Sequence, residues 1–169
     1  MLFEVYGNIL KDDYNIICYQ ANCKGIMKSG IAQDIALKYP NVSSRNNDYC
    51  RLNEPLGTIL PVTVGKNKIC VSLYGQLDYG YGRTCRTDFT ALQSALNELA
   101  DRLNHSIIPE AAKIAFPNRM GCGLGSGEWQ KVIQMLRDFD RKVRQDVYIV
   151  TYRHRNGADK NVKVNSAAG

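Results

Sequence analysis

Apolar positions recur along the chain with two different periods. Short β-branched and alternating runs predict about six strands, at Leu2–Tyr6, Asn15–Tyr19, Thr58–Val64, Lys68–Tyr74, Ala112–Phe116 and Val147–Tyr152. Helical spacing separates these runs. Strands that alternate with helices predict an α/β layered fold with a mixed, largely parallel central sheet.

Three helices follow from the apolar stripes. One runs over 31–39 and is stopped by Pro40. A second carries leucines at 3-4 spacing over 89–103 and has Thr87 as its possible N-cap. A third begins after Ser126. Residues 41–57 are polar with little periodicity, which predicts a short helix or a loop over the sheet.

Length and composition indicate one ordinary globular domain. The chain has 169 residues, of which 44% are hydrophobic and 22% charged, so neither disorder nor a fibrous repeat is favoured. We expect the domain to span residues 1–152 and residues 153–169 to form a basic flexible tail. That tail holds four basic residues and one acidic residue, which is +3 of the net charge of +6. The charge therefore does not decide between a small anion and a nucleic acid as partner.

Location and cofactor content can also be predicted. The first fifteen residues contain Glu4, Asp12 and Asp13 and no long apolar run, and no membrane-length apolar stretch occurs elsewhere. We therefore expect a soluble cytoplasmic protein with no membrane partner. The six cysteines include no CxxC pair, which favours buried reduced thiols over a zinc cluster or a disulfide framework. We expect no metal and no cofactor.

Two segments share one plan: a β-prone run, a loop with glycines, and the start of a helix. The first runs over 18–32 and the second over 114–129. Glycines let backbone N–H groups approach a ligand closely, and a helix N-terminus adds partial positive charge. Either loop alone is explained by a tight strand-to-helix turn, but two in one domain indicate a diphosphate held between them.

Established nucleotide motifs fit these loops poorly. Residues 25–30 begin like a P-loop, but Ile31 stands where a lysine is required. Residues 121–126 nearly match a dinucleotide fingerprint, but Ser126 occupies the third glycine position. ATP hydrolysis is disfavoured, and a Rossmann dehydrogenase stays a weak alternative.

The two loops together resemble the macrodomain family, over nearly the whole chain from Glu4 to Tyr152. The most specific parts are the segment with Asn22, Gly25, Met27 and Gly30, and the Gly-Cys-Gly-Leu run within 117–129. The resemblance is to the branch of terminal ADP-ribose glycohydrolases and ADP-ribose 1″-phosphate phosphatases. It implies a three-layer α/β/α fold that binds ADP-ribose, or a derivative, in a cleft at the strand ends.

The resemblance also implies a set of ligand-binding residues. Asn8 and Ile9 would face the adenine, although the family usually has aspartate where Asn8 stands, and Asn22 would point at the distal ribose. The full set that it implies is Asn8, Ile9, Asn22, Gly25, Met27, Ser29, Gly30, Ile31, Gln76, Pro117, Gly121, Cys122, Gly123, Leu124 and Gly125.

Catalysis is less clear from this resemblance. Glycohydrolases of the branch use a lysine and an aspartate, whereas this chain has Gln76 and Gly125 at those positions. Neither supplies a nucleophilic amine or a carboxylate. Hydrolysis is still feasible if Asn22, the expected catalytic residue, positions a water with the loop amides. Asp78 and Glu128 are nearby carboxylates, but Glu128 is explained by the dipole of its helix.

Three functions remain open. The chain is a hydrolase for ADP-ribose 1″-phosphate or ADP-ribosylated substrates, a non-catalytic ADP-ribose reader, or a nucleic-acid-binding domain. We expect ADP-ribose or a derivative as the small-molecule partner. An ADP-ribosylated protein or a nucleic acid would be the macromolecular partner. The loop over 73–82, which holds Tyr74, Tyr79 and Tyr81, is a candidate lid.

Overall fold

The protein is built around one twisted sheet with helices on both faces. Our computed structural model describes residues 1–79, 87–122, 126–153 and 163–165. Its strands are β1 (Leu2–Gly7), β2 (Ile16–Asn22), β3 (Ile59–Gly65), β4 (Lys68–Gln76), β5 (Lys113–Pro117), β6 (Asp146–Tyr152) and β7 (Lys163–Asn165). Its helices are α1 (Gly30–Lys38), α2 (Pro40–Leu52), α3 (Phe89–Asn104) and α4 (Ser126–Lys142).

The sheet is mixed and largely parallel, as the sequence predicted. Its order is β3-β4-β2-β5-β6-β1-β7. The five inner strands run parallel to their neighbours, and β3 and β7 pair antiparallel at the two edges. All six predicted strands are present, and the seventh, β7, comes from the segment beyond residue 152.

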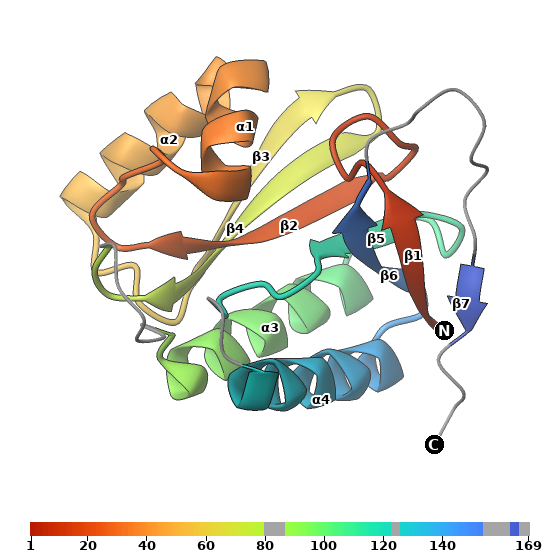
Figure 1. Cartoon of the computed structure of the whole chain (residues 1–169). Helices are drawn as coiled ribbons and strands as arrows, with labels where there is room; N and C mark the ends of the chain where they lie inside the picture. The colour runs from red at the N-terminus through yellow and green to blue at the C-terminus, as the bar shows by residue number, and fades with distance from the viewer. Residues whose placement is uncertain (80–86, 123–125, 154–162, 166–169) are drawn as a thin grey trace.

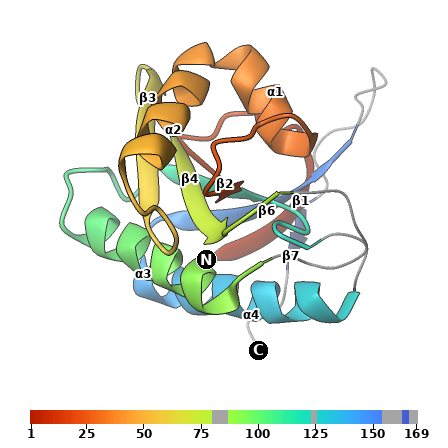
Figure 2. The same cartoon turned by 90° about the vertical axis from the view of Figure 1, so that its left-hand side faces the viewer.

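Helices α1 and α2 cover one face of the sheet, and α3 and α4 cover the other (Figure 1). Each face has its own apolar core: Leu92 and Leu96 of α3 are buried with Phe116 of β5 on one face, and Ile35 of α1 is buried with Tyr19 of β2 on the other. This is the three-layer α/β/α arrangement that the family resemblance implied. A side view shows the sheet edge-on between the two helical layers (Figure 2).

Two local predictions change in the structure. The polar segment 41–57 is mostly helical, since α2 runs to Leu52 with Pro40 in its first turn, where its missing N–H is tolerated. The N-cap of α3 is Asp88, whose carboxylate accepts from the backbone N of Ala91 at 3.0 Å. Thr87 is therefore not the cap as predicted, because its hydroxyl accepts from Gln20 of β2 and donates to the carbonyl of Gly121 after β5.

Candidate functional site

The two glycine loops lie side by side at the carboxyl edge of the sheet. The first connects β2 to α1, and the second connects β5 to α4. Since β2 and β5 are parallel neighbours, the chain leaves both strands at the same edge. This edge of an open α/β sheet is where ligands usually bind.

Asn22 braces the first loop. Its Oδ1 accepts from the backbone N of Lys24 at 3.0 Å and of Ile26 at 3.2 Å, and its Nδ2 donates to the carbonyl of Ile26 at 2.8 Å. Gly25 lies inside this turn with φ of +72°, a conformation that favours glycine. The carboxamide expected to act on the distal ribose thus makes three bonds to its own loop.

The side chain of Met27 anchors this loop in the core. Met27 is 9% exposed, and the hydroxyl of Tyr19 lies 3.9 Å from its sulfur. Ser72 donates to the same hydroxyl at 2.7 Å, and burial raises the pKa of Tyr19. Ile31 packs against the same core. Any contact of Met27 with a ligand at this edge would therefore come from the backbone, whereas the side chain of Ile31 is only partly buried.

The N-terminus of α1 is left open to an anion. Ser29 stands at the N-cap position in extended conformation, but its side chain makes no capping hydrogen bond, and the first turn holds no acidic residue. Gly30 has φ of +57°, with open space where a Cβ would stand. Lys24 and Lys28 are exposed beside it. By contrast, α3 is capped by its own Asp88.

The second loop folds tightly after Pro117, the last residue of β5. The backbone N of Asn118 donates to the carbonyl of Val150 at 2.9 Å, which ties the loop to β6. Arg119 and Gly121 both have positive φ, of 58° and 70°, so the chain reverses twice before Cys122, which is buried. Gly123, Leu124 and Gly125, also expected to bind the ligand, lie outside the described residues.

A polar cluster connects this loop to β4. Gln20 of β2 donates from Nε2 to Gln76 Oε1 at 3.2 Å and to Thr87 Oγ1 at 2.9 Å, and Thr87 donates to the carbonyl of Gly121. The sequence analysis did not single out Gln20, and it considered Thr87 only as a helix cap. The sequence signal that could have indicated Gln20 is a long polar side chain near the end of β2, which is otherwise largely apolar.

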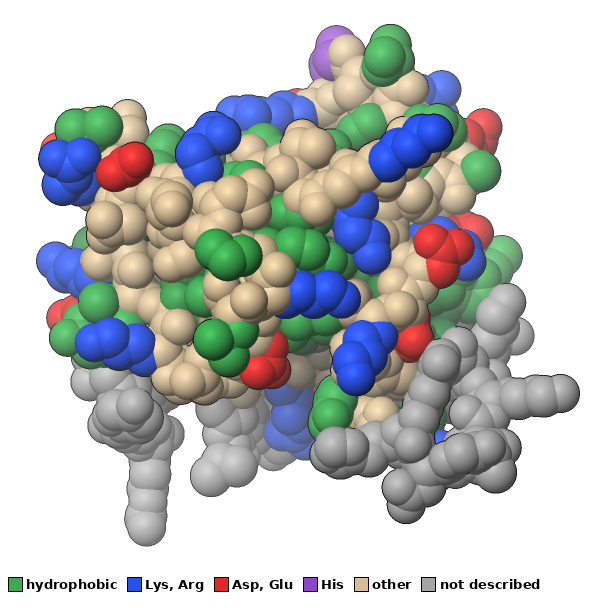
Figure 3. All heavy atoms as spheres, turned by 90° about the horizontal axis from the view of Figure 1, so that it is seen from above, with side chains coloured by type: hydrophobic (Ala, Val, Ile, Leu, Met, Phe, Trp, Pro, Cys, Tyr) green, Lys and Arg blue, Asp and Glu red, His purple; other side chains and the backbone are tan. Residues whose placement is uncertain are grey.

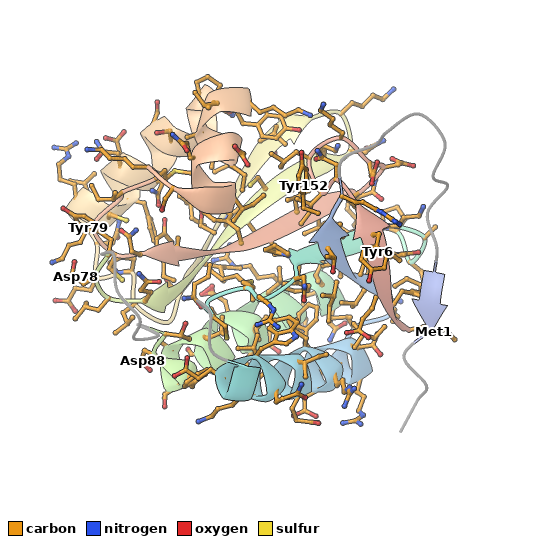
Figure 4. All side chains as sticks on the ribbon, viewed as in Figure 1. Met1, Tyr6, Asp78, Tyr79, Asp88 and Tyr152 are labelled. Atoms are coloured by element: carbon orange, nitrogen blue, oxygen red, sulfur yellow. The ribbon has the colours of Figure 1, made fainter. Side chains whose placement is uncertain are left out.

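The chain after Gln76 forms an ordered turn beside the first loop. The backbone N of Cys23 donates to the carbonyls of Gln76, at 3.0 Å, and Leu77, at 3.3 Å, and Gln76 Nε2 donates to the carbonyl of Asp78. Asp78 and Tyr79 are exposed at this corner of the molecule (Figure 4). Tyr74, expected in a lid, is instead fully buried in β4, so that part of the prediction was wrong.

The other end of this edge is formed by the loop after β1. Asn8 Oδ1 accepts from the backbone N atoms of Leu10, at 3.0 Å, and Lys11, at 3.1 Å, and Ile9 is buried. Tyr152, at the end of β6, is 61% exposed and in register with Gly7 (Figure 4). The sequence analysis treated Tyr152 only as part of a strand.

Other features of the described residues bear on the earlier expectations. No group of three or more His, Cys, Asp or Glu side chains within them is placed to hold a metal ion, and none of their helices is long and apolar enough to cross a membrane. The described cysteines form no disulfide. Trp129 is buried in the core. A groove of about 520 Å³, lined by Ile69 and Ile108, lies at the amino edge, away from the glycine loops.

The fold is similar to those of several solved macrodomains. The macrodomains of Thermus aquaticus DarG and Mycobacterium tuberculosis DarG both have a TM-score of 0.74, with 19% and 20% identity, over 91% of this chain and 99% of theirs. Thermosipho africanus DarTG in complex with ADP-ribose has a TM-score of 0.64 and 18% identity, over 82% of this chain and 38% of that chain. No protein-family model matches the sequence, and a search of curated proteins finds no match. The chain has the macrodomain fold.

Proposed function

We propose that the chain binds ADP-ribose, or a derivative that keeps its diphosphate, between the two glycine loops. The observation that carries the proposal is the pairing of these loops at one sheet edge, where the N-terminus of α1 has neither a side-chain cap nor an acidic residue. Thermosipho africanus DarTG, of similar fold, was solved in complex with ADP-ribose.

The diphosphate accounts for the first-loop geometry. The first N–H groups of a helix have no partner within the helix, and the helix dipole favours negative charge there. Ser29 and Gly30 begin this helix, open space lies where a Cβ of Gly30 would stand, and Asn22 holds the preceding turn in place. Phosphate oxygens are strong acceptors, so they fit this end of α1.

The adenine would lie at the β1 and β6 side of the edge. Tyr152 presents an exposed aromatic ring there, and buried Ile9 gives the neighbouring loop an apolar base. Because Asn8 Oδ1 already accepts two backbone bonds, it is less available to the adenine amino group than the sequence implied. We therefore assign adenine binding mainly to stacking on the ring.

The distal ribose would lie at the β4 side, near Gln76. In the sheet, β4 and β6 are separated by β2 and β5, so three strand spacings, about 14 Å, lie between Gln76 and Tyr152. A ligand that contacts both must be elongated. ADP-ribose, with a ribose at each end of its diphosphate, meets this requirement.

Hydrolysis is a second candidate function, and Asp78 is the observation that favours it. Asn22 and Gln76 are neutral amides held by hydrogen bonds, so neither exchanges a proton with a reacting group. Asp78 is an exposed carboxylate two residues after Gln76, and Gln76 Nε2 bonds to its backbone carbonyl. It would act as the base for a water at the distal end of the ligand. The Asp78→Asn variant should then keep ADP-ribose affinity but lose turnover of ADP-ribose 1″-phosphate or of an ADP-ribosylated protein.

A nucleic acid is a weaker candidate partner. On the face that carries α1 and α2, the described Lys and Arg side chains are scattered among apolar and polar atoms and form no continuous basic stripe (Figure 3). A nucleic-acid surface needs several adjacent phosphate contacts. Binding with a steep salt dependence that disappears on deletion of residues 153–169 would instead support this partner.

The deciding experiment is calorimetric titration of ADP-ribose, with AMP and NAD as comparison ligands, on the wild type, Ser29→Asp and Ser29→Asn. An aspartate at the N-cap of α1 should stabilise the helix by up to about 1 kcal/mol, because its carboxylate meets the dipole. The same carboxylate repels the phosphates, so ADP-ribose affinity should fall at least tenfold. Ser29→Asn places no negative charge beside the phosphates, so its affinity should fall clearly less than that of Ser29→Asp. No ADP-ribose binding by the wild type, or equal affinity in Ser29→Asp, would rule out the proposal.

A further inference from the structure

We infer that Gln20 is a positioning residue that holds Gln76 and, in the second glycine loop, Gly121 in the arrangement that the ligand requires. The inference rests on the proposed function. Gln20 belongs to β2, and the residues it organises belong to three other segments: the end of β4, the residues just before α3 and the loop after β5.

The carboxamide of Gln20 is wedged between two glycines. A Cβ at Gly75 would lie 2.9 Å from Gln20 Oε1, and a Cβ at Gly121 would lie 2.4 Å from the same oxygen. Real Cβ contacts are not that short, so a residue with a side chain fits at neither position unless Gln20 moves. The carboxamide of Gln20 therefore packs directly against the backbone of Gly75 in β4 and of Gly121 in the second loop.

Hydrogen bonds then orient the groups on either side of the wedge. Both N–H bonds of Gln20 Nε2 are used, one to Gln76 Oε1 at 3.2 Å and one to Thr87 Oγ1 at 2.9 Å. The hydroxyl of Thr87 in turn donates a hydrogen bond to the carbonyl of Gly121. The carboxamide of Gln20 thus restrains Gln76, the side chain expected near the distal ribose. Through Thr87 it also restrains the carbonyl of Gly121 in the second loop.

The carboxamide is not the most stabilising group for this position. Gln20 Oε1 is buried and has no hydrogen-bond partner among the described residues, which costs stability. An unbranched apolar side chain of the same length would fill the space between Gly75 and Gly121 without that unpaired acceptor. A purely structural role and a positioning role therefore predict different behaviour for Gln20→Met.

The Gln20→Met variant should stay folded, with a melting temperature within a few degrees of the wild type, because methionine fills the space between Gly75 and Gly121. Its affinity for ADP-ribose should fall about tenfold, since Gln76 Oε1 loses its donor and Thr87, which donates to the Gly121 carbonyl, loses the bond that orients its hydroxyl. Its affinity for AMP, which does not reach Gln76, should stay within about twofold of the wild type.

A matched control exists at the opposite edge of the sheet. Gln145 is 1% exposed, its Nε2 lies 3.4 Å from the carbonyls of Ile108 and Pro109, and its Oε1 is likewise buried without a described partner. Gln145→Met makes the same chemical change far from the glycine loops. It should leave the affinities for both ADP-ribose and AMP unchanged.

Thr87 provides an independent route if Gln20→Met does not fold. Thr87→Val keeps the shape but removes the hydroxyl, and Thr87→Ser restores the hydroxyl. We expect ADP-ribose affinity to fall about fivefold in Thr87→Val and to recover in Thr87→Ser. Calorimetry with ADP-ribose and AMP on all four variants and the wild type tests the inference.

The outcomes separate the two proposals. A wild type that does not bind ADP-ribose overturns the proposed function and this inference with it. A wild type that binds ADP-ribose, with affinity retained in Gln20→Met or, if that variant is unfolded, in Thr87→Val, overturns only the positioning role. An equal loss for ADP-ribose and AMP would also overturn it, because the effect would then be structural.

Discussion

Replacing Gly121 with alanine should cost far more stability than the same change at Gly30. Both glycines have positive φ, of 70° and 57°, so an alanine at either position pays about 1–2 kcal/mol for the left-handed conformation. Only Gly121 adds a collision, since its Cβ would meet Gln20 Oε1 at 2.4 Å and Thr87 Oγ1 at 2.7 Å. At Gly30 nothing lies within 4 Å.

The collision sets the size of the difference. Forcing an extra methyl group into a packed site costs about 1–3 kcal/mol, so Gly121→Ala should lose about 2–5 kcal/mol in total. For a chain of this length the melting temperature falls roughly 2–4 °C per kcal/mol, which gives roughly 10 °C for Gly121→Ala and roughly 4 °C for Gly30→Ala. Both variants carry the strain of a positive φ, so the difference between them measures the collision at Gly121.

Urea unfolding followed by circular dichroism measures both variants against the wild type. A double-mutant cycle then locates the collision: in a Gln20→Ala background the 2.4 Å contact is gone, so the Gly121→Ala penalty should shrink by about 1 kcal/mol or more. Equal destabilisation by the two alanines, or an unchanged penalty in the Gln20→Ala background, would refute the wedge geometry.

Three further predictions concern the scaffold. Asp88→Ala should lower the free energy of unfolding by about 1 kcal/mol, measured by urea denaturation, because the cap on the N–H of Ala91 is lost. Tyr74→Phe should cost about 1–3 kcal/mol in the same assay, because the 2.6 Å hydrogen bond to buried Asn46 disappears. Burial raises the pKa of Tyr14 from 10.0 to about 12, so its share of the stability is complete below pH 10 and is lost as the pH rises towards 12. Stability measured from pH 9 to 12 should therefore decline less steeply in Tyr14→Phe; an identical slope would contradict this assignment.

Strands and helices could be predicted because their signals are local. The apolar runs predicted all six inner and edge strands up to Tyr152, and the leucine stripe of α3 is buried from Leu92 to Leu103. Errors occurred where two adjacent residues offered the same local chemistry. Thr87 and Asp88 are both good caps, and only the pairing of the chain with the end of β4, through the bond from Asp88 N to the carbonyl of Gly75 at 2.7 Å, decides between them.

The candidate site was predictable in outline but not in its working parts. Glycines after a strand and before a helix indicate a backbone that approaches a ligand, whatever the partner strand is. What a side chain such as Asn22, Met27 or Gln76 does depends on its three-dimensional surroundings. Asn22 turns back on its own loop, Met27 points into the core, and Gln76 bonds to a residue 56 positions away.

The sequence by itself determined the layered α/β class, the order of the elements and the two glycine loops, because hydrophobic period and turn chemistry act over a few neighbouring residues. Only the tertiary structure decided which strands are neighbours, and hence that both loops meet at one edge. It also decided that Gln20 shares the space of Gly75 and Gly121. Such contacts join segments that are far apart in the chain, and a local sequence pattern does not determine how close two such segments lie in the folded protein.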